Sequence, residues 1–174
     1  VVINAFGSRS RMQRALDIAS WEEWDARLDF FLDPKPPEGI LGKLKALPRV
    51  GELASVFPKT VRSGPCQEVV ETGDAVDLSA LPILTCWPQD AGPFITMPLV
   101  ITKDPASGKT NVGMYRMQVY DRRTTGMHWQ KHKDGAGQAR GYERGGRRME
   151  VAVAIGADPA TVFSGVAPLP PGIS

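Results

Sequence analysis

The sequence predicts an α+β protein with an N-terminal α/β region at residues 1–62 and a β-rich domain at residues 63–174. Three observations predict this class. Apolar residues recur at helical spacing in the first region, whereas strand-like apolar runs dominate the second. The change falls at Ser63-Gly64-Pro65, a turn-forming tripeptide.

The first region begins with the apolar run Val1 to Phe6, which predicts a short buried strand. A helix is expected around Met12 to Ile18. Ser20, followed three residues later by Glu23, is typical of a capping box at the start of a second helix, which Asp33-Pro34 ends. Two further short helices are predicted at ILGKLKALP and ELASVF.

The strands of the second region are predicted by its apolar runs: CQEVVE, FITMPLVITKD, Val112 to Tyr120, Gly126 to His132 and MEVAVAIG. The segment PASGKT (residues 105–110) supplies a turn between the second and third runs. ADPATVF opens a helix, with Asp158 as the N-cap and Pro159 at the first helical position.

Composition narrows the class of protein. A chain of 174 residues, 42% hydrophobic and 23% charged, can bury a sizeable core. No apolar run has the length of a membrane span. A net charge of +2 is too small to indicate a polyanionic partner. The two cysteines, Cys66 and Cys86, form neither a disulfide framework nor a metal cluster, which fits a reducing, cytoplasmic setting.

Both ends of the sequence are unusual for a complete protein. It begins Val1-Val2-Ile3 without methionine, and it stops at the proline-rich segment APLPPGIS. We expect a piece of a longer protein; the alternative is a complete small protein with a frayed tail.

Residues 111–132, NVGMYRMQVYDRRTTGMHWQKH, hold both histidines of the chain and many other ligand-binding side chains. If a hairpin turn is centred near Asp121-Arg122, residues whose numbers sum to about 243 face each other. Asn111 then faces His132 at roughly 5 Å. An amide oxygen with an imidazole nitrogen suits Mn²⁺, and a carboxylate or a cofactor phosphate would complete the site.

Arg116 lies farther along the same predicted strand. An arginine in a β-rich core needs an anionic partner, because an unpaired buried charge is costly, and its planar fork matches a carboxylate. The neighbouring residues favour a pocket for a flat, phosphorylated cofactor beside a carboxylic acid. Flat ring faces are offered by Tyr115 and Trp129, and hydrogen-bond donors by Gln130 and Lys133.

The segment NVGMYRMQVYDRRTTGMHWQKHKDGA resembles the cofactor-binding hairpin of the UbiD-type decarboxylases, which use prenylated FMN. Further blocks resemble the family in the same order: INAFGSRSRM, SGPCQEVV, DLSALPILTCWPQDAGPFIT and VAVAIGADPATVFSGVAPLP. The resemblance implies a split-barrel flavin-binding domain at residues 63–174, incomplete at its C-terminus, and assembly into homo-oligomers, as dimers or hexamers.

The resemblance also implies roles for single residues. Asn111 and His132 would bind Mn²⁺, with K⁺ as a further candidate cation, and Arg116 would act in catalysis by holding the substrate carboxylate. The implied contacts to prenylated FMN are Met114, Tyr115, Arg116, His128, Trp129, Gln130, Lys133 and Asp134. Position 128 is histidine where some members carry arginine. The acid and base residues and a glutamate ligand of the metal are expected after APLP, since Glu143 and Glu150 are not at the matching positions.

The implied function is non-oxidative decarboxylation of an aromatic or unsaturated carboxylic acid, such as a 4-hydroxy-3-polyprenylbenzoate of ubiquinone-type quinone biosynthesis. A prenylated substrate would add peripheral contact with the inner face of the cell membrane.

Two alternatives stay open: a flavin-binding or assembly fragment without activity, and a basic nucleic-acid-binding module. The second rests on eight Lys/Arg against two acids from Arg122 to Arg148. We favour a solvated basic loop there and expect no nucleic-acid partner.

Overall fold

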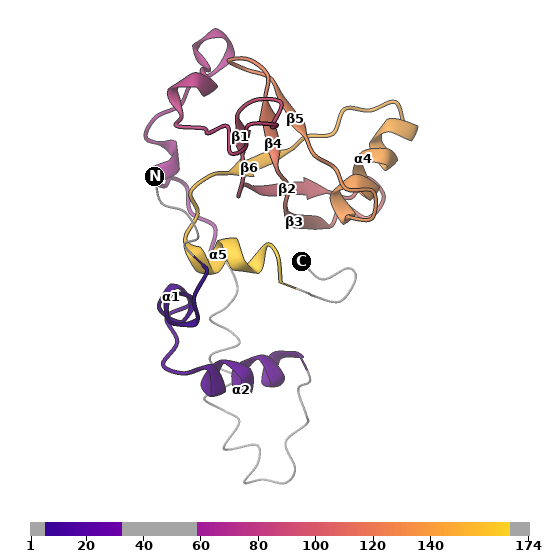
Figure 1. Cartoon of the computed structure of the whole chain (residues 1–174). Coiled ribbons are helices and arrows are strands. Elements are labelled where there is room, and N and C mark those ends of the chain that lie inside the picture. The colour runs from indigo at the N-terminus through magenta and orange to yellow at the C-terminus, as the bar shows by residue number, and fades with distance from the viewer. Residues whose placement is uncertain (1–5, 33–58, 168–174) are drawn as a thin grey trace. The chain divides into compact units, whose positions relative to one another are not determined.

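The structure is a computed structural model that describes residues 6–32 and 59–167 (Figure 1). The chain divides into two compact units, Val1–Val70 and Glu71–Ser174, and each is described by itself. The two helices expected between residues 40 and 57, and the expected first strand apart from Phe6, lie outside the described residues. The domain boundary at residue 63 remains a prediction.

The first unit contains helix α1 (Arg9–Ala15), helix α2 (Trp21–Leu32) and the 3₁₀ helix η1 (Pro65–Gln67). One of the two hydrogen bonds of the expected capping box at the start of α2 is confirmed: the Glu23 N–H donates to Ser20 Oγ at 3.1 Å. The predicted strand CQEVVE is wrong. Its first residues form η1, and Val69 and Val70 are exposed, without a strand of the described residues to pair with.

The second unit holds two three-stranded antiparallel sheets, in the orders β1-β4-β5 and β3-β2-β6. The strands are β1 (Phe94–Ile95), β2 (Leu99–Lys103), β3 (Thr110–Met114), β4 (Met117–Val119), β5 (Thr125–Met127) and β6 (Ala152–Ala154). In the part of the chain that the structure describes, no ladder joins the two sheets, so they do not close into a barrel. Together with the helices, they confirm the predicted α+β class.

Two predicted strands are each split between the two sheets. FITMPLVITKD becomes β1 and β2, with the break at Met97-Pro98, where proline lacks the N–H that a ladder needs. The run from Val112 to Tyr120 becomes β3 and β4, with the break at Tyr115-Arg116. At each break the chain leaves one sheet and enters the other, as strands do at the corners of packed sheets.

The predicted hairpin is confirmed for β4 and β5, which pair Met117 with Met127 and Val119 with Thr125. However, β5 ends at Met127 and does not continue to His132. The predicted cross-strand pair of Asn111 and His132 is therefore wrong. Because β3 belongs to the other sheet, Asn111 lies opposite Thr102 on β2 instead.

The core of this unit is formed by buried residues of both sheets: Ile95, Val100, Tyr115 and Met117. Helix α4 (Asp134–Arg144) lies against β2 and β3 and replaces the solvated basic loop that we expected (Figure 1). Its first turn is buried at Gly135 and Ala136, which explains why this polar sequence is ordered as a helix.

Helix α5 (Pro159–Ser164) confirms the predicted cap, because Asp158 accepts from the N–H groups of Ala160 and Thr161, both at 3.1 Å. Two further 3₁₀ helices, η2 (Gly73–Ala75) and η3 (Leu78–Ala80), precede β1. Over residues 6–32 and 59–167, no helix combines the length and the apolar character that crossing a membrane requires.

Candidate cofactor and metal site

A pocket of about 550 Å³ brings Asn111 and His132 together, although no strand pairing connects them. Four parts of the second unit form it: the turn between β2 and β3, the start of β3, the segment that precedes α4, and α4 itself. The residues that line it are Asp104, Ser107, Lys109, Thr110, Asn111, Lys131, His132, Lys133, Asp134, Gly137, Gln138 and Arg140.

The turn at one rim of the pocket is closed by Asp104. Its carboxylate accepts from the N–H and the hydroxyl of Ser107, at 3.1 and 2.5 Å, and from the N–H of Ala106 at 3.3 Å. The hydroxyl of Ser107 is the main cause that lowers the pKa of Asp104. Gly108 completes the turn at φ 71°, a left-handed conformation that suits glycine. Asp104 is thus an ionised part of the turn, with its oxygens already hydrogen bonded.

Asn111 and His132 differ in how firmly they are held. Asn111 is buried on β3, and its Nδ2 donates to Thr102 Oγ1 at 3.2 Å. His132 is exposed and lies in the turn before α4. That turn is tied by two hydrogen bonds, from the Lys133 N–H to the carbonyl of Gln130 at 3.0 Å and from Arg140 Nη1 to the carbonyl of Lys131 at 3.3 Å.

The pocket carries more positive than negative charge. Two carboxylates line it, Asp104 and Asp134, against four cationic side chains: Lys109, Lys131, Lys133 and Arg140. Clustered cations in a concave site attract and concentrate anions such as phosphate. For a metal, the described residues offer no group of three or more His, Cys, Asp or Glu side chains. Asn111 and His132 are therefore two donors that need further ligands.

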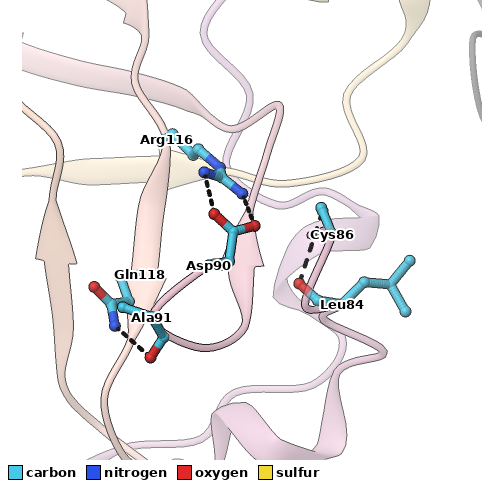
Figure 2. A network of polar contacts seen from close by, with 6 residues as sticks. All are labelled: Leu84, Cys86, Asp90, Ala91, Arg116 and Gln118. Atoms are coloured by element: carbon cyan, nitrogen blue, oxygen red, sulfur yellow. Dashed lines mark hydrogen bonds and ion pairs between the residues drawn. The ribbon is translucent and has the colours of Figure 1, made fainter. Parts of the chain in front are cut away.

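Arg116 has the anionic partner that the sequence predicted, and the partner is Asp90 (Figure 2). Its Nη1 and Nη2 donate to the two oxygens of Asp90 at 3.0 and 2.6 Å. The guanidinium also lies over the ring of Phe94, 3.8 Å from the ring centroid. These hydrogen bonds lower the pKa of Asp90 and raise that of Arg116. The fork is partly open to solvent, since the Arg116 side chain is 30% exposed and that of Asp90 is 12% exposed.

The loop that carries Asp90 is fixed to β4 at two more points. Gln118 Nε2 donates to the carbonyl of Ala91 at 3.1 Å, as Figure 2 shows. The Val119 N–H donates to the carbonyl of Pro93 at 2.9 Å. The loop therefore fixes the position of the Asp90 carboxylate. The carboxylate in turn fixes the guanidinium of Arg116.

The remaining predicted cofactor contacts lie outside the pocket of Asn111. Tyr115 is buried, its ring meets that of Trp129 edge-on with centroids 4.8 Å apart, and its hydroxyl accepts from the Gly135 N–H at 2.9 Å. The side chain of Tyr115 is therefore part of the core, and its contact with a cofactor stays a prediction. The His128 N–H donates to the carbonyl of Arg116 at 2.9 Å, which places these two residues side by side. His128 and Gln130 are exposed, and Met114 is half-buried.

Several residues of the site carried no recognisable signal in the sequence. The need of Arg116 for an anion indicated a carboxylate, but nothing singled out Asp90, which lies 26 positions away. Thr102 and Gln138 read as ordinary strand and helix residues. Lys131 and Arg140 stood within a run that we interpreted as a solvated loop, and Lys109 stood in the predicted turn PASGKT.

Comparisons with known proteins identify the family of this chain. The sequence profile described as "UbiD: 3-octaprenyl-4-hydroxybenzoate carboxy-lyase Rift-related domain" matches residues 59–174. An uncharacterized protein of Archaeoglobus fulgidus is 51% identical over an alignment of 175 positions, which covers 100% of this chain and 35% of that protein. The chain spans about a third of the length of the curated relatives it matches.

The solved structures that are similar to the chain include two enzymes of this kind. An evolved dimeric form of the UbiD-class enzyme HmfF from Pelotomaculum thermopropionicum, in complex with prFMN, is 36% identical with a TM-score of 0.54, over 57% of this chain and 23% of that chain. The vanillic acid decarboxylase of Sedimentibacter hydroxybenzoicus in closed form is 26% identical with a TM-score of 0.71, over 96% of this chain and 33% of that chain. Since the profile covers well over half of the sequence, the resemblance is confirmed, and this chain belongs to the UbiD family.

Proposed function

We propose that this chain forms the cofactor-binding part of a non-oxidative decarboxylase that uses prenylated FMN. The observation that carries the proposal is the pocket in which Asn111 and His132 converge among four cationic side chains. HmfF, a UbiD-class enzyme similar in sequence and fold, has been solved in complex with prFMN. Membership of a family described as a carboxy-lyase supports the reaction class.

The pocket fits a phosphate better than it fits a bare metal ion. A phosphate monoester carries about −1.5 to −2 charges at neutral pH. Four cations and two carboxylates leave the lining of the pocket with a net charge of +2, which would match it. Mn²⁺ accepts mixed nitrogen and oxygen ligands, so the amide of Asn111 and the imidazole of His132 are suitable donors. We propose that the cofactor phosphate is a further ligand of this ion. K⁺ is a further candidate cation for this part of the protein.

The reaction explains why the chain needs a cofactor and an oriented arginine. When CO₂ leaves an unsaturated carbon, prenylated FMN supplies the electron sink that side chains lack. Arg116 has five N–H donors, of which two serve Asp90, and its side chain also interacts with Cys86. We propose that a substrate carboxylate binds to further donors of the guanidinium. The stacking on Phe94 and the fork with Asp90 hold the guanidinium in one orientation before substrate binds.

The proposed substrate is an aromatic or unsaturated carboxylic acid, with a 4-hydroxy-3-polyprenylbenzoate as the specific candidate. The family description names a prenylated hydroxybenzoate. The vanillic acid decarboxylase is a similar protein whose name gives a smaller phenolic acid as its substrate. Homo-oligomerisation is proposed by analogy with the dimeric form of HmfF. Peripheral contact with a membrane would follow only from a prenylated substrate.

Flavin titration tests the proposal, because FMN and riboflavin differ only in the phosphate. We expect the chain to quench FMN fluorescence at lower concentrations than riboflavin, and Mn²⁺ to strengthen FMN binding only. Lys109→Ala in the pocket should weaken FMN binding, whereas Lys103→Ala, an exposed lysine outside it, should not. Equal affinity for both flavins would contradict the phosphate site. Release of CO₂ from aromatic acids with prenylated FMN present would separate an enzyme from a flavin-binding fragment without activity.

A further inference from the structure

Behind the pocket, three side chains from three elements form a hydrogen-bonded row. Thr102 on β2 donates from Oγ1 to Oε1 of Gln138 on α4 at 2.6 Å. Asn111 on β3 donates from Nδ2 to the same Thr102 Oγ1 at 3.2 Å. Thr102 is 1% exposed and Asn111 is 7% exposed, so water cannot readily replace these bonds. The row ends in the pocket, which both Asn111 and Gln138 line.

The single proton of the Thr102 hydroxyl decides how the amide of Asn111 is turned. A hydroxyl donates one hydrogen bond and accepts others, whereas an amide oxygen can only accept. Since Thr102 gives its proton to Gln138, it can only accept from Asn111, and only the NH₂ end of that amide can donate. The other end, Oδ1, is then the atom of Asn111 that can serve a ligand in the pocket.

We propose that Thr102 and Gln138 are positioning residues that hold the amide oxygen of Asn111 toward a cation in the pocket. This inference rests on the proposed function, in which Asn111 is a metal ligand. With the amide reversed, the NH₂ group would meet the cation with its positive end. Partners that orient a metal ligand typically change metal affinity by about 10-fold to 100-fold when they are removed.

The row also connects the two halves of the pocket. Gln138 is on α4, the helix that follows His132, whereas Asn111 is on β3. A shift of α4 would break the hydrogen bond between Gln138 and Thr102. The Thr102 hydroxyl could then donate to Asn111 Oδ1 instead. Orientation of the Asn111 amide and seating of α4 are thus one event, a link that a solitary buried threonine would not create.

Four variants separate the hydrogen bonds from simple packing. Thr102→Val keeps the shape and removes the hydroxyl, whereas Thr102→Ser keeps the hydroxyl. Gln138→Leu removes the acceptor, so the Thr102 proton is free to donate to Asn111 Oδ1 and the amide turns over. Gln138→Glu keeps an acceptor at the same place. Melting temperatures of all four check that each variant folds.

The first measurement needs no metal. The side-chain NH₂ signals of Asn111, assigned in the NMR spectrum by their loss in Asn111→Asp, should exchange slowly with water in the unmutated chain, Thr102→Ser and Gln138→Glu. They should move and exchange faster in Thr102→Val and Gln138→Leu. The second measurement is Mn²⁺ binding, followed by electron paramagnetic resonance with FMN present. We expect the dissociation constant to rise about 10-fold to 100-fold in Thr102→Val and Gln138→Leu but not in Thr102→Ser. Gln138→Glu is left out of this comparison, because it adds a negative charge to the lining of the pocket.

Each contrary result overturns a defined step. Unchanged NH₂ signals in Thr102→Val and Gln138→Leu would show that the row does not exist in solution. Weak Mn²⁺ binding in Thr102→Ser as well as Thr102→Val would assign the effect to packing and overturn the positioning role. If the NH₂ signals behave as expected but the unmutated chain binds no Mn²⁺, the proposed metal site fails and the row is purely structural.

Discussion

Replacing Tyr115 by phenylalanine removes one buried hydrogen bond and little else. The hydroxyl of Tyr115 accepts from the Gly135 N–H at 2.9 Å, and both residues are buried. The ring contact with Trp129 needs no hydroxyl, so phenylalanine can retain it. Gly135 is the second residue of α4, and the first four N–H groups of a helix have no acceptor within the helix. The variant therefore isolates the bond that anchors the start of α4.

The expected loss of stability follows from a buried donor left without a partner, about 1–3 kcal/mol. In a chain of 174 residues, each kcal/mol lowers Tm by about 2–4 °C, so we expect a fall of about 2–12 °C. FMN affinity should also fall, because the residues just before Gly135 belong to the pocket: His132, Lys133 and Asp134.

Urea denaturation and thermal melting, both followed by circular dichroism, measure the effect. Tyr120→Phe is the matched control, because Tyr120 is 62% exposed and its change should stay within about 0.5 kcal/mol. If Tyr115→Phe unfolds at the same urea concentration and temperature as the unmutated chain, α4 is not anchored by this bond. Unchanged stability with lost FMN binding would instead make the Tyr115 side chain a cofactor contact.

Three further predictions concern charge and capping. Asp90→Asn should make the stability of the fold less sensitive to acid. Arg116 lowers the pKa of folded Asp90 below its unfolded value of about 3.9. The stabilisation by this pair is therefore present above about pH 3.9 and is lost as the pH falls through the folded pKa. Urea midpoints from pH 6 downward should therefore drop more for the unmutated chain than for the variant, and parallel curves would contradict the pairing. Asp158→Ala should cost about 0.5–2 kcal/mol through loss of the α5 cap, with Asp158→Asn as the control that retains an acceptor. FMN affinity should weaken as ionic strength rises from about 0.01 to 0.15 M, where the Debye length falls from about 30 to about 8 Å, and riboflavin binding should not.

Local features of the fold could be predicted from the sequence because a few neighbouring residues determine them. The caps at Ser20 and Asp158, the turn predicted at residues 105–110 and the hairpin of β4 and β5 all follow from short-range chemistry. The breaks at Met97-Pro98 and Tyr115-Arg116 could not be located in the same way. An apolar run looks the same whether it stays in one sheet or crosses to the next, and only tertiary packing decides.

The sequence predicted the candidate site from a cross-strand pair of Asn111 and His132, and the structure does not contain that pair. Asn111 and His132 line one pocket because α4 packs against β2 and β3, and not because they face each other across a hairpin. The partner of Arg116 was required by electrostatics, but its identity depends on how a loop 26 positions earlier folds against β4. Residues that act through such long-range contacts, Asp90, Thr102 and Gln138, leave no local pattern to find.

Native mass spectrometry of the chain, purified from cells that make prenylated FMN and supplied with Mn²⁺, tests the central claim most directly. We predict a complex of the unmutated chain with one flavin and one metal ion, and loss of the metal together with most of the flavin in Asn111→Ala and in His132→Ala. Lys103→Ala, a substitution outside the pocket, should retain both. A folded chain that carries neither flavin nor metal, or variants that retain both as well as the unmutated chain does, would contradict the assignment of this pocket as the cofactor site.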